Sequence, residues 1–524
     1  MGSGTGPLFH FPPETVFIPP VTTARFVLAA ALTLGLLEAA DRPQYGEAWS
    51  RNMTSSERGL PADFDPVTRR GIRWSVPLGA PGSESHSTPV VSRGRVYIGT
   101  NNEAPRDPRR TGDRGVFLCL SEKSGELLWQ LVVPKREEDI YHDWPKTGMS
   151  SPGTVEGDRV YLVDNRGVVL CLDAKGLADG NQGVTNESAY CTPKTTNGVP
   201  AVPEIPLGPL DADILWSFDL TREVGIWSHD AAHSSILVDG DHLYLNTGNG
   251  VDNTHRRIRR PDAPSLVVLD KRTGRLLAQD GLGIGPRIFH CTWSSPAMAR
   301  IDGRRRIVFA GGDGVLYGFE PFKARRGAAG VARLDEVWRF DFDPEAPKSD
   351  VASYLNNRRT SPSNIYGMPV VDGDRIYVAG GGDWFWGKNE AWVKCLRAGG
   401  KGDTSATSLV WSHPIGRHTM STPAVAGGMV FAADSMRTFH CIDAATGEGL
   451  WSHELDGEVW ASALVADGKV YIGTRRGGFY VFALSKEKRL LGQVRLDAPI
   501  SATPVAANRV LYVGTGRTLY AVAK

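Results

Sequence analysis

The feature that most constrains this chain is a short strand motif that recurs eight times. Gly157–Leu162 reads Gly-Asp-Arg-Val-Tyr-Leu, and its variants align on one aromatic residue each: Tyr97, Tyr161, Tyr244, Phe309, Tyr377, Phe431, Tyr471 and Tyr512. The shortest spacings between copies, 40 and 41 residues, match one four-stranded propeller blade of about 40–50 residues. Longer spacings indicate blades with inserted loops. The repeat therefore predicts a closed array of sheets rather than several domains.

Each unit has the same internal order. A Ser/Thr-x-Pro-Val-Val strand is followed by a glycine turn, the Val-Tyr-Ile strand, an alternating apolar strand and a Thr-Gly or Ser-Gly turn. The unit ends on a fourth strand that often carries tryptophan: Trp129, Trp216, Trp338, Trp411 and Trp451. β-Branched and aromatic runs bounded by glycine and proline are typical of strands. We expect a nearly all-β chain.

The two ends of the chain predict how the array closes. The last unit stops after its third strand, Thr518–Val522, and lacks a fourth. Residues 71–78 carry Trp74 in the same context as Trp451 and can supply that strand. Pairing them removes an exposed sheet edge. The sequence thus predicts an eight-bladed β-propeller over residues 71–524.

The residues before the propeller predict a leader (1–40) and an N-terminal linker (41–70). Phe26–Leu37 is a 12-residue apolar run, which is too short to span a bilayer and fits the apolar region of a signal peptide. The alternative is a disordered leader, because the preceding residues are Pro-rich and carry almost no positive charge. We expect an exported, periplasmic or cell-envelope protein that is not transmembrane. The net charge of +1 provides no global field for nucleic acid.

The repeated Thr-Gly-x-x-x-Trp unit resembles the pyrroloquinoline quinone (PQQ) repeat. After residue 70 the chain is identified as a member of the quinoprotein alcohol dehydrogenase-like superfamily. That superfamily contains PQQ-dependent dehydrogenases and non-enzymatic scaffolds such as BamB. The resemblance therefore implies a propeller and leaves both kinds of function open.

One segment is similar to the dehydrogenases in particular. Tyr244–Gly250 reads Tyr-Leu-Asn-Thr-Gly-Asn-Gly, and the resemblance implies Asn249 as a Ca²⁺ ligand beside PQQ, since a carboxamide oxygen suits Ca²⁺. The catalytic aspartate of that family follows a tryptophan, but Ser294 follows Trp293 here. The expected general base is therefore missing from this place. Asp164 stands where the family has its glutamate ligand and could substitute for it.

One face of a propeller gathers the loops between second and third strands with the segments that start each blade. Polar and aromatic residues are concentrated there, which predicts a binding funnel. Glu103 and Asn249 are candidates for binding a cation; the alternative is loop capping. Trp293 and Trp384 are candidates for contacting a cofactor, and Trp384 and Trp386 can stack on a sugar, a quinone or a partner chain. The alternative is that the last two fold back over the blade.

The start of the third blade carries the sharpest candidate metal ligands. His229, Asp230 and His233 form a His-Asp-x-x-His pattern, and His290 opens the next blade. Imidazole and carboxylate groups suit Zn²⁺ or a similar ion. The alternative is structural, because histidines at blade starts can bond the carbonyls of neighbouring blades.

Three functions follow from these observations. The favoured one is a non-catalytic binding or scaffold protein that takes a protein partner or a small-molecule ligand on the funnel face. The first alternative is a dehydrogenase that uses PQQ and Ca²⁺, supported by Asn249 and opposed by Ser294. The second alternative is a metal-using enzyme at the histidine-rich funnel. The sequence does not decide whether the protein is an enzyme.

Overall fold

The structure is a computed structural model of the chain, and it describes residues 1, 2, 4, 6, 8, 10, 40–136, 143–195, 197–230, 235–301, 303–324 and 330–524. Ala39–Lys524 form one compact unit, and Met1–Glu38 form a separate one. The predicted signal-peptide segment, Phe26–Leu37, lies outside the described residues. No helix in the described ranges is long and apolar enough to cross a membrane.

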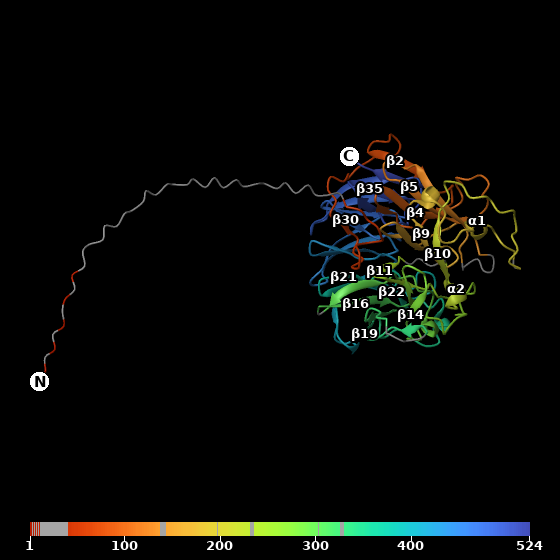
Figure 1. Ribbon diagram of the computed structural model, residues 1–524. Coiled ribbons are helices and arrows are strands. Elements are labelled where there is room, and N and C mark those ends of the chain that lie inside the picture. Colours follow the sequence, from red (N-terminus) through yellow and green to blue (C-terminus); the bar gives the residue numbers. More distant parts are fainter. Residues whose placement is uncertain are drawn as a thin grey trace. The chain divides into compact units, whose positions relative to one another are not determined.

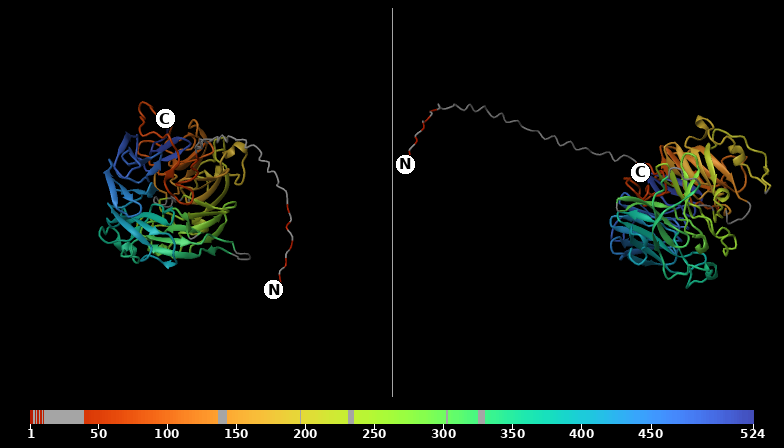
Figure 2. Two further views of the ribbon diagram at one scale, coloured as in Figure 1. Left: turned by 90° about the vertical axis from the view of Figure 1, so that its left-hand side faces the viewer. Right: turned by 60° about the horizontal axis from the view of Figure 1, so that its bottom comes forward.

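The described strands form eight sheets, each with four antiparallel main strands, which confirms the predicted eight-bladed propeller. Figure 2 shows the sheets following one another around a ring in sequence order. The first four blades are β3–β6 (Val90–Ser92, Arg95–Asn101, Arg114–Ser121, Leu127–Pro134), β7–β10 (Thr154–Glu156, Arg159–Val163, Val168–Asp173, Ile214–Asp219), β11–β14 (Leu237–Asp239, His242–Asn246, Leu266–Asp270, Leu276–Gln279) and β15–β17 with β19 (Ala297–Ile301, Arg304–Ala310, Val315–Phe319, Glu336–Asp341).

The remaining four blades complete the ring. They are β21–β23 with β25 (Val370–Asp372, Arg375–Gly382, Ala391–Arg397, Leu409–Ile415), β26–β29 (Ala424–Ala426, Met429–Ala433, Thr438–Asp443, Gly449–Glu454), β30–β33 (Leu464–Ala466, Lys469–Gly473, Gly478–Ala483, Leu490–Arg495) and β34–β36 with β2 (Val505–Ala507, Val510–Gly514, Thr518–Val522, Ile72–Pro77).

Short strands and helices are attached to the blades. The minor strands extend the sheets: β1 (Thr54–Ser55), β18 (Ala332–Arg333), β20 (Ser363–Asn364) and β24 (Gly402–Asp403). The described helices have three or four residues each: η1 (Gly176–Asp179), α1 (Glu187–Tyr190), α2 (Leu220–Glu223), η2 (Gly285–Arg287) and η3 (Val351–Tyr354).

The ring is closed by the two ends of the propeller, as predicted. β2 pairs antiparallel with β36, and Trp74 stands opposite Ala521. Figure 1 shows the C-terminus beside β2. The Trp74 indole is 5% exposed and donates from Nε1 to the Glu122 carbonyl of the first blade at 2.9 Å. The front strand therefore fills the last blade and also anchors it to its neighbour.

The Thr-Gly-x-x-x-Trp pattern has a physical explanation in the packing between blades. Four of the fourth-strand tryptophans lie over a glycine turn of the next blade, and the indole N–H of each donates to a carbonyl there, as Trp411 does to Ala444 at 3.0 Å. A Cβ on these glycines would lie 2.5 to 2.8 Å from the indole: Gly125 under Trp74, Gly176 under Trp129, Gly274 under Trp216 and Gly447 under Trp411. All four also have positive φ. Only glycine satisfies both conditions.

The segment that the sequence assigns to a linker forms part of the propeller. Residues 40–57, here called the N-terminal strap, bond the first strand of every blade in turn. The pairs are Arg42 with Val91, Pro43 with Val155, Trp49 with Val238 and Met298, Ser50 with Val371, Asn52 with Val425, Met53 with Val465 and Ser55 with Ala506. The strap thus follows the inner strands around the ring and closes one end of the central channel.

Candidate functional site

A cavity of about 430 Å³ lies where the blades of the ring meet. Segments from all eight blades line it, from Glu84 at the start of the first to Ser501 at the start of the last. Tyr45 of the strap forms part of its floor, and the Tyr45 hydroxyl bonds Ser462 Oγ at 3.2 Å and Thr503 Oγ1 at 3.0 Å. A cavity therefore lies among the loops where the sequence predicts a binding funnel, and part of its base comes from a segment that the sequence places outside the propeller.

Aromatic side chains make up much of the cavity wall: Trp144, Trp293, Tyr366, Phe385, Trp386 and Trp460. They come from blade-start segments and from the loop between β22 and β23. The Trp293 and Tyr366 rings lie 4.8 Å apart, and the Trp386 ring lies 5.0 Å from the His255 ring. Rings in this arrangement present flat apolar faces with a few polar edges, which suits a small organic molecule.

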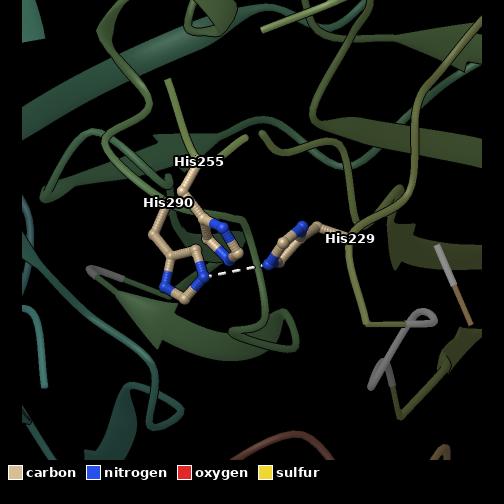
Figure 3. A group of neighbouring side chains, drawn as sticks. All are labelled: His229, His255 and His290. Carbon is tan, nitrogen blue, oxygen red and sulfur yellow. Dashed lines mark hydrogen bonds between the residues drawn. The ribbon is translucent and has the colours of Figure 1, made fainter. Parts of the chain in front are cut away.

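Three histidines converge beside these rings. His229 and His290 precede β11 and β15, and His255 lies in the loop between β12 and β13. One ring nitrogen from each lies within 4.8 Å of those of the other two. Figure 3 shows the three imidazoles turned toward a common point, and the Nε2 atoms of His229 and His290 are 2.9 Å apart. The fold thus joins residues that are up to 61 positions apart in the chain.

The outer nitrogens of two of these rings are held by acceptors. His229 Nδ1 bonds the Val251 carbonyl at 2.9 Å, and His290 Nδ1 bonds Asp383 Oδ2 at 2.9 Å. Both histidines and Asp383 are buried. Burial lowers the pKa of His290, but the Asp383 carboxylate outweighs it, so the pKa is raised overall. Fixed outer bonds orient both imidazoles and aim their Nε2 atoms at each other.

Asp383 connects the histidines to the aromatic wall. It follows β22 and also accepts bonds from the Tyr366 hydroxyl and from the backbone N–H groups of Phe385 (2.9 Å) and Trp386 (2.6 Å). Burial raises the pKa of Asp383, but His290 and these donors lower it below its usual value. Neither Asp383 nor Tyr366 was predicted from the sequence, where the one signal is a carboxylate directly after Gly380–Gly382.

The predicted metal ligands are partly brought together. His229, Asp230 and His290 meet, with Asp230 Oδ2 lying 3.6 Å from His229 Nε2. His233 lies outside the described residues. His255 completes the cluster instead.

The predicted cofactor residues are spread over different places. Trp293 lines the cavity, whereas Trp384 packs edge-on against His418 with ring centres 5.4 Å apart and does not line it. Glu103 lies 3.8 Å from Lys146 Nζ, also away from the cavity lining. Asn249 is fully buried: its Oδ1 accepts from the Trp227 N–H and its Nδ2 donates to the Arg260 carbonyl, both at 3.0 Å.

The side chains at the places implied by the PQQ-dependent dehydrogenases do not form a site for the Ca²⁺ ion that accompanies PQQ in those enzymes. Both ends of the Asn249 amide already bond backbone, which is the loop-capping alternative. Asp164 Oδ1 accepts from the N–H groups of Arg166 and Val168 and caps its own turn. Ser294 Oγ donates to the Gly367 carbonyl at 2.9 Å. A Ca²⁺ site needs several oxygens directed at one point, and these oxygens are used elsewhere.

A charged cluster lies on another part of the cavity wall. The Arg475 guanidinium lies 3.9 Å from the centre of the Trp460 ring, and its Nη2 donates to Glu84 Oε1 at 2.6 Å. His86 stacks on the same Trp460 ring, with ring centres 5.6 Å apart, and its Nε2 lies 3.2 Å from Glu84 Oε2. The hydrogen bond from His86 is the main reason that the pKa of Glu84 is lowered to about 2.

Replacing Glu84 with glutamine tests this cluster through the pH dependence of stability. Because the folded pKa of about 2 lies below the ordinary glutamate pKa of 4.5, the stabilisation is present above pH 4.5 and is lost as the pH falls toward 2. The side chain is 36% exposed, so solvent screening limits the expected loss at pH 7 to about 1 kcal/mol. Urea unfolding of both proteins at pH 7 and pH 3 checks this. A difference that does not change with pH would contradict the assignment.

Comparison with known proteins finds a matching family model and solved structures of the same fold. A family model described as outer membrane protein assembly factor BamB matches residues 38–312 and 391–521, which is more than half of the chain. A search of the curated proteins finds no match.

Two solved structures show the same architecture. BamB from Moraxella catarrhalis aligns with a TM-score of 0.50 and 12% identity, over 86% of this chain and 97% of that one. A europium-containing methanol dehydrogenase aligns with a TM-score of 0.55 and 12% identity, over 91% of this chain and 90% of that one. At such identity the likeness concerns the fold alone.

Proposed function

The chain belongs to the PQQ-repeat family described as outer membrane protein assembly factor BamB, and we propose that it is a non-catalytic binding protein whose central cavity takes a small organic ligand. The observation that carries the proposal is the cavity itself. It measures about 430 Å³, receives segments from every blade and has an aromatic wall. Cavities of this size that combine aromatic rings with polar side chains are typical of small-molecule sites.

The hydrogen bonds that hold part of the wall in place support ligand binding. Asp383 bonds the backbone of the aromatic loop, the Tyr366 hydroxyl and His290 at once, so the ring positions are set before any ligand enters. Preorganised aromatic faces lower the entropy cost of binding. A PQQ-dependent reaction is not favoured, because Asn249 and Ser294 bond backbone groups rather than facing a shared ion.

We also propose that the protein acts outside the cytoplasm. The apolar run Phe26–Leu37 supports this, as does the family description. Cell fractionation with N-terminal sequencing of the mature chain tests it, and an intact N-terminus in the cytosolic fraction would contradict it.

Replacing Trp386 with alanine is expected to weaken ligand binding by about tenfold or more, because each stacked aromatic contributes roughly 1–3 kcal/mol. The probes are PQQ, with and without Ca²⁺, and a set of quinones and aryl glycosides, each titrated by intrinsic tryptophan fluorescence. A binding protein of this kind would bind one of these probes without oxidising an alcohol or aldose. Turnover with PQQ and Ca²⁺ would instead support the dehydrogenase alternative.

The same loop offers a matched control. Trp384 lies two residues away but packs on His418 outside the cavity lining. Replacing Trp384 with alanine should leave the affinity unchanged. Equal losses in both variants would show that the loop as a whole, and not the cavity wall, is responsible. If no probe binds the intact protein, the proposal of a small-ligand site in this cavity fails.

A further inference from the structure

We propose that His229, His255 and His290 bind one divalent first-row transition-metal ion at the wall of the central cavity. The inference goes beyond ligand binding and does not depend on it, since it concerns a site built from side chains of this chain alone. Three observations carry it: the protonation of the two buried rings, the position of the third ring, and the partners that hold the rings from outside.

The first observation concerns hydrogen atoms. A backbone carbonyl and a carboxylate only accept hydrogen bonds, so Nδ1 of His229, facing Val251 O, and Nδ1 of His290, facing Asp383 Oδ2, both carry the proton. In neutral rings the two Nε2 atoms then carry lone pairs, yet they lie 2.9 Å apart. Two lone pairs at this distance repel unless a cation lies between or beside them. A proton or a metal ion can fill that role.

The second observation favours a metal ion. A shared proton joins two nitrogens, but here a third imidazole, that of His255, brings its nitrogen within 4.8 Å of both. The Asp230 carboxylate is also close, 3.6 Å from His229 Nε2. Three imidazole nitrogens are a common donor set for a four-coordinate ion whose fourth ligand is a carboxylate or a water, with metal–nitrogen distances of about 2.0–2.1 Å.

The third observation concerns the hydrogen bonds that hold the two buried imidazoles on the side away from the cluster. Metal-binding histidines usually donate their other N–H to a carbonyl or a carboxylate, which fixes the ring and increases its basicity. His229 and His290 show one case each. In addition, Asp230 and His255 both have φ of 56°, a left-handed conformation that is uncommon for non-glycine residues and clusters at functional sites.

The donors select the class of ion. Imidazole suits Zn²⁺, Co²⁺, Ni²⁺ and Cu²⁺, whereas Ca²⁺ and Mg²⁺ prefer oxygen ligands. Asp230, His255 and His290 line the cavity, while His229 lies behind them. The ion would therefore face the cavity, where a ligand group or water can reach it.

Metal titration of tag-free protein, stripped with a chelator, tests the proposal. We expect the wild type to take up about one Zn²⁺ per chain by calorimetry and elemental analysis, and Co²⁺ to give the visible absorption of a four-coordinate site. Replacing His255 or His290 with alanine should lower the Zn²⁺ affinity by at least tenfold. His255→Ala is the safer variant for folding because His255 is only partly buried on a loop. Asp383→Asn should weaken binding by about 10–100-fold through its effect on His290.

His418 provides the matched control. It is another buried histidine of the funnel, but its Nδ1 bonds the Gly382 carbonyl at 2.8 Å and it is not part of the cluster. His418→Ala should keep the metal. The proposal is overturned if the wild type binds no Zn²⁺, Co²⁺ or Cu²⁺ at stoichiometric concentration, which would leave a shared proton between the rings. It is also overturned if His255→Ala binds Zn²⁺ as tightly as the wild type. Because these titrations use metal alone, their failure leaves the proposed organic ligand untouched.

Discussion

Replacing Arg51 with alanine is expected to lower the free energy of unfolding by about 3–5 kcal/mol. The Arg51 side chain is fully buried in the N-terminal strap. Its Nε donates to the Pro296 carbonyl at 2.8 Å, and its Nη2 donates to the Ser235 carbonyl at 2.9 Å. Nη1 donates to the Tyr45 carbonyl at 3.2 Å. Alanine would leave a cavity and would leave these buried acceptors without their donor. This loss is larger than the gain from no longer burying a charged guanidinium.

Two further variants separate the loss of packing from the loss of hydrogen bonds. Arg51→Met keeps much of the volume without the donors, so it should recover the packing and not the hydrogen bonds. Arg58, exposed in the chain just after the strap, should tolerate alanine within about 0.5 kcal/mol. Urea unfolding followed by circular dichroism measures all three. If Arg51→Ala is no less stable than Arg58→Ala, the strap does not hold the ring as the structure indicates.

Replacing Trp74 with alanine is expected to cost about 3–5 kcal/mol, the usual range for a large aromatic side chain in a core. The indole packs over Gly125, lies 5.9 Å from the Tyr512 ring and bonds the Glu122 carbonyl. It sits on the strand that closes the ring, so its loss also weakens the pairing of β2 with β36. We expect limited proteolysis of the variant to cut the chain near residues 65–80 before any other site.

Trp451 gives the comparison. It occupies the equivalent place in an interior blade, with its Nε1 donating to the Ser485 carbonyl at 3.0 Å, but it is less buried. Trp451→Ala should therefore cost less than Trp74→Ala and leave the N-terminal cleavage pattern unchanged. Trp74→Phe should cost about 1 kcal/mol, mainly the lost hydrogen bond. A larger loss in Trp451→Ala than in Trp74→Ala would show that ring closure adds nothing to the stability of the last blade.

The fold was predictable because its rules are local and repeated. The aromatic strand residues, the fourth-strand tryptophans and the glycine turns each occur in many blades, so one irregular copy does not hide the pattern. The closing strand was predictable because Trp74 reproduces the context of Trp451 and the last unit lacks a strand. The strap was not, because residues 40–57 bond the ring mostly through backbone groups, and every residue except proline carries the same ones.

The candidate site was predictable only as a region. The sequence placed histidines and tryptophans on one face, and it found His229, Asp230, His290 and Trp293. It gave no means of telling Trp384, which packs outside the cavity, from Trp386, which lines it. Nor could it show that the Asn249 side-chain amide hydrogen-bonds backbone groups, since the Asn-Gly context is similar whether the side chain caps a loop or binds an ion.

By itself, the sequence determined the architecture: eight blades, the order of strands within each, and closure by the two ends of the propeller. It could do so because the repeat period and the pairing of strands within a blade depend on residues that lie close together in the chain. The tertiary structure alone decided which polar groups meet. The convergence of His229, His255 and His290, the role of Asp383 behind them and the closing of the channel by Tyr45 depend on the angles at which separate blades aim their loops. Those angles arise from packing between blades, which no single segment encodes.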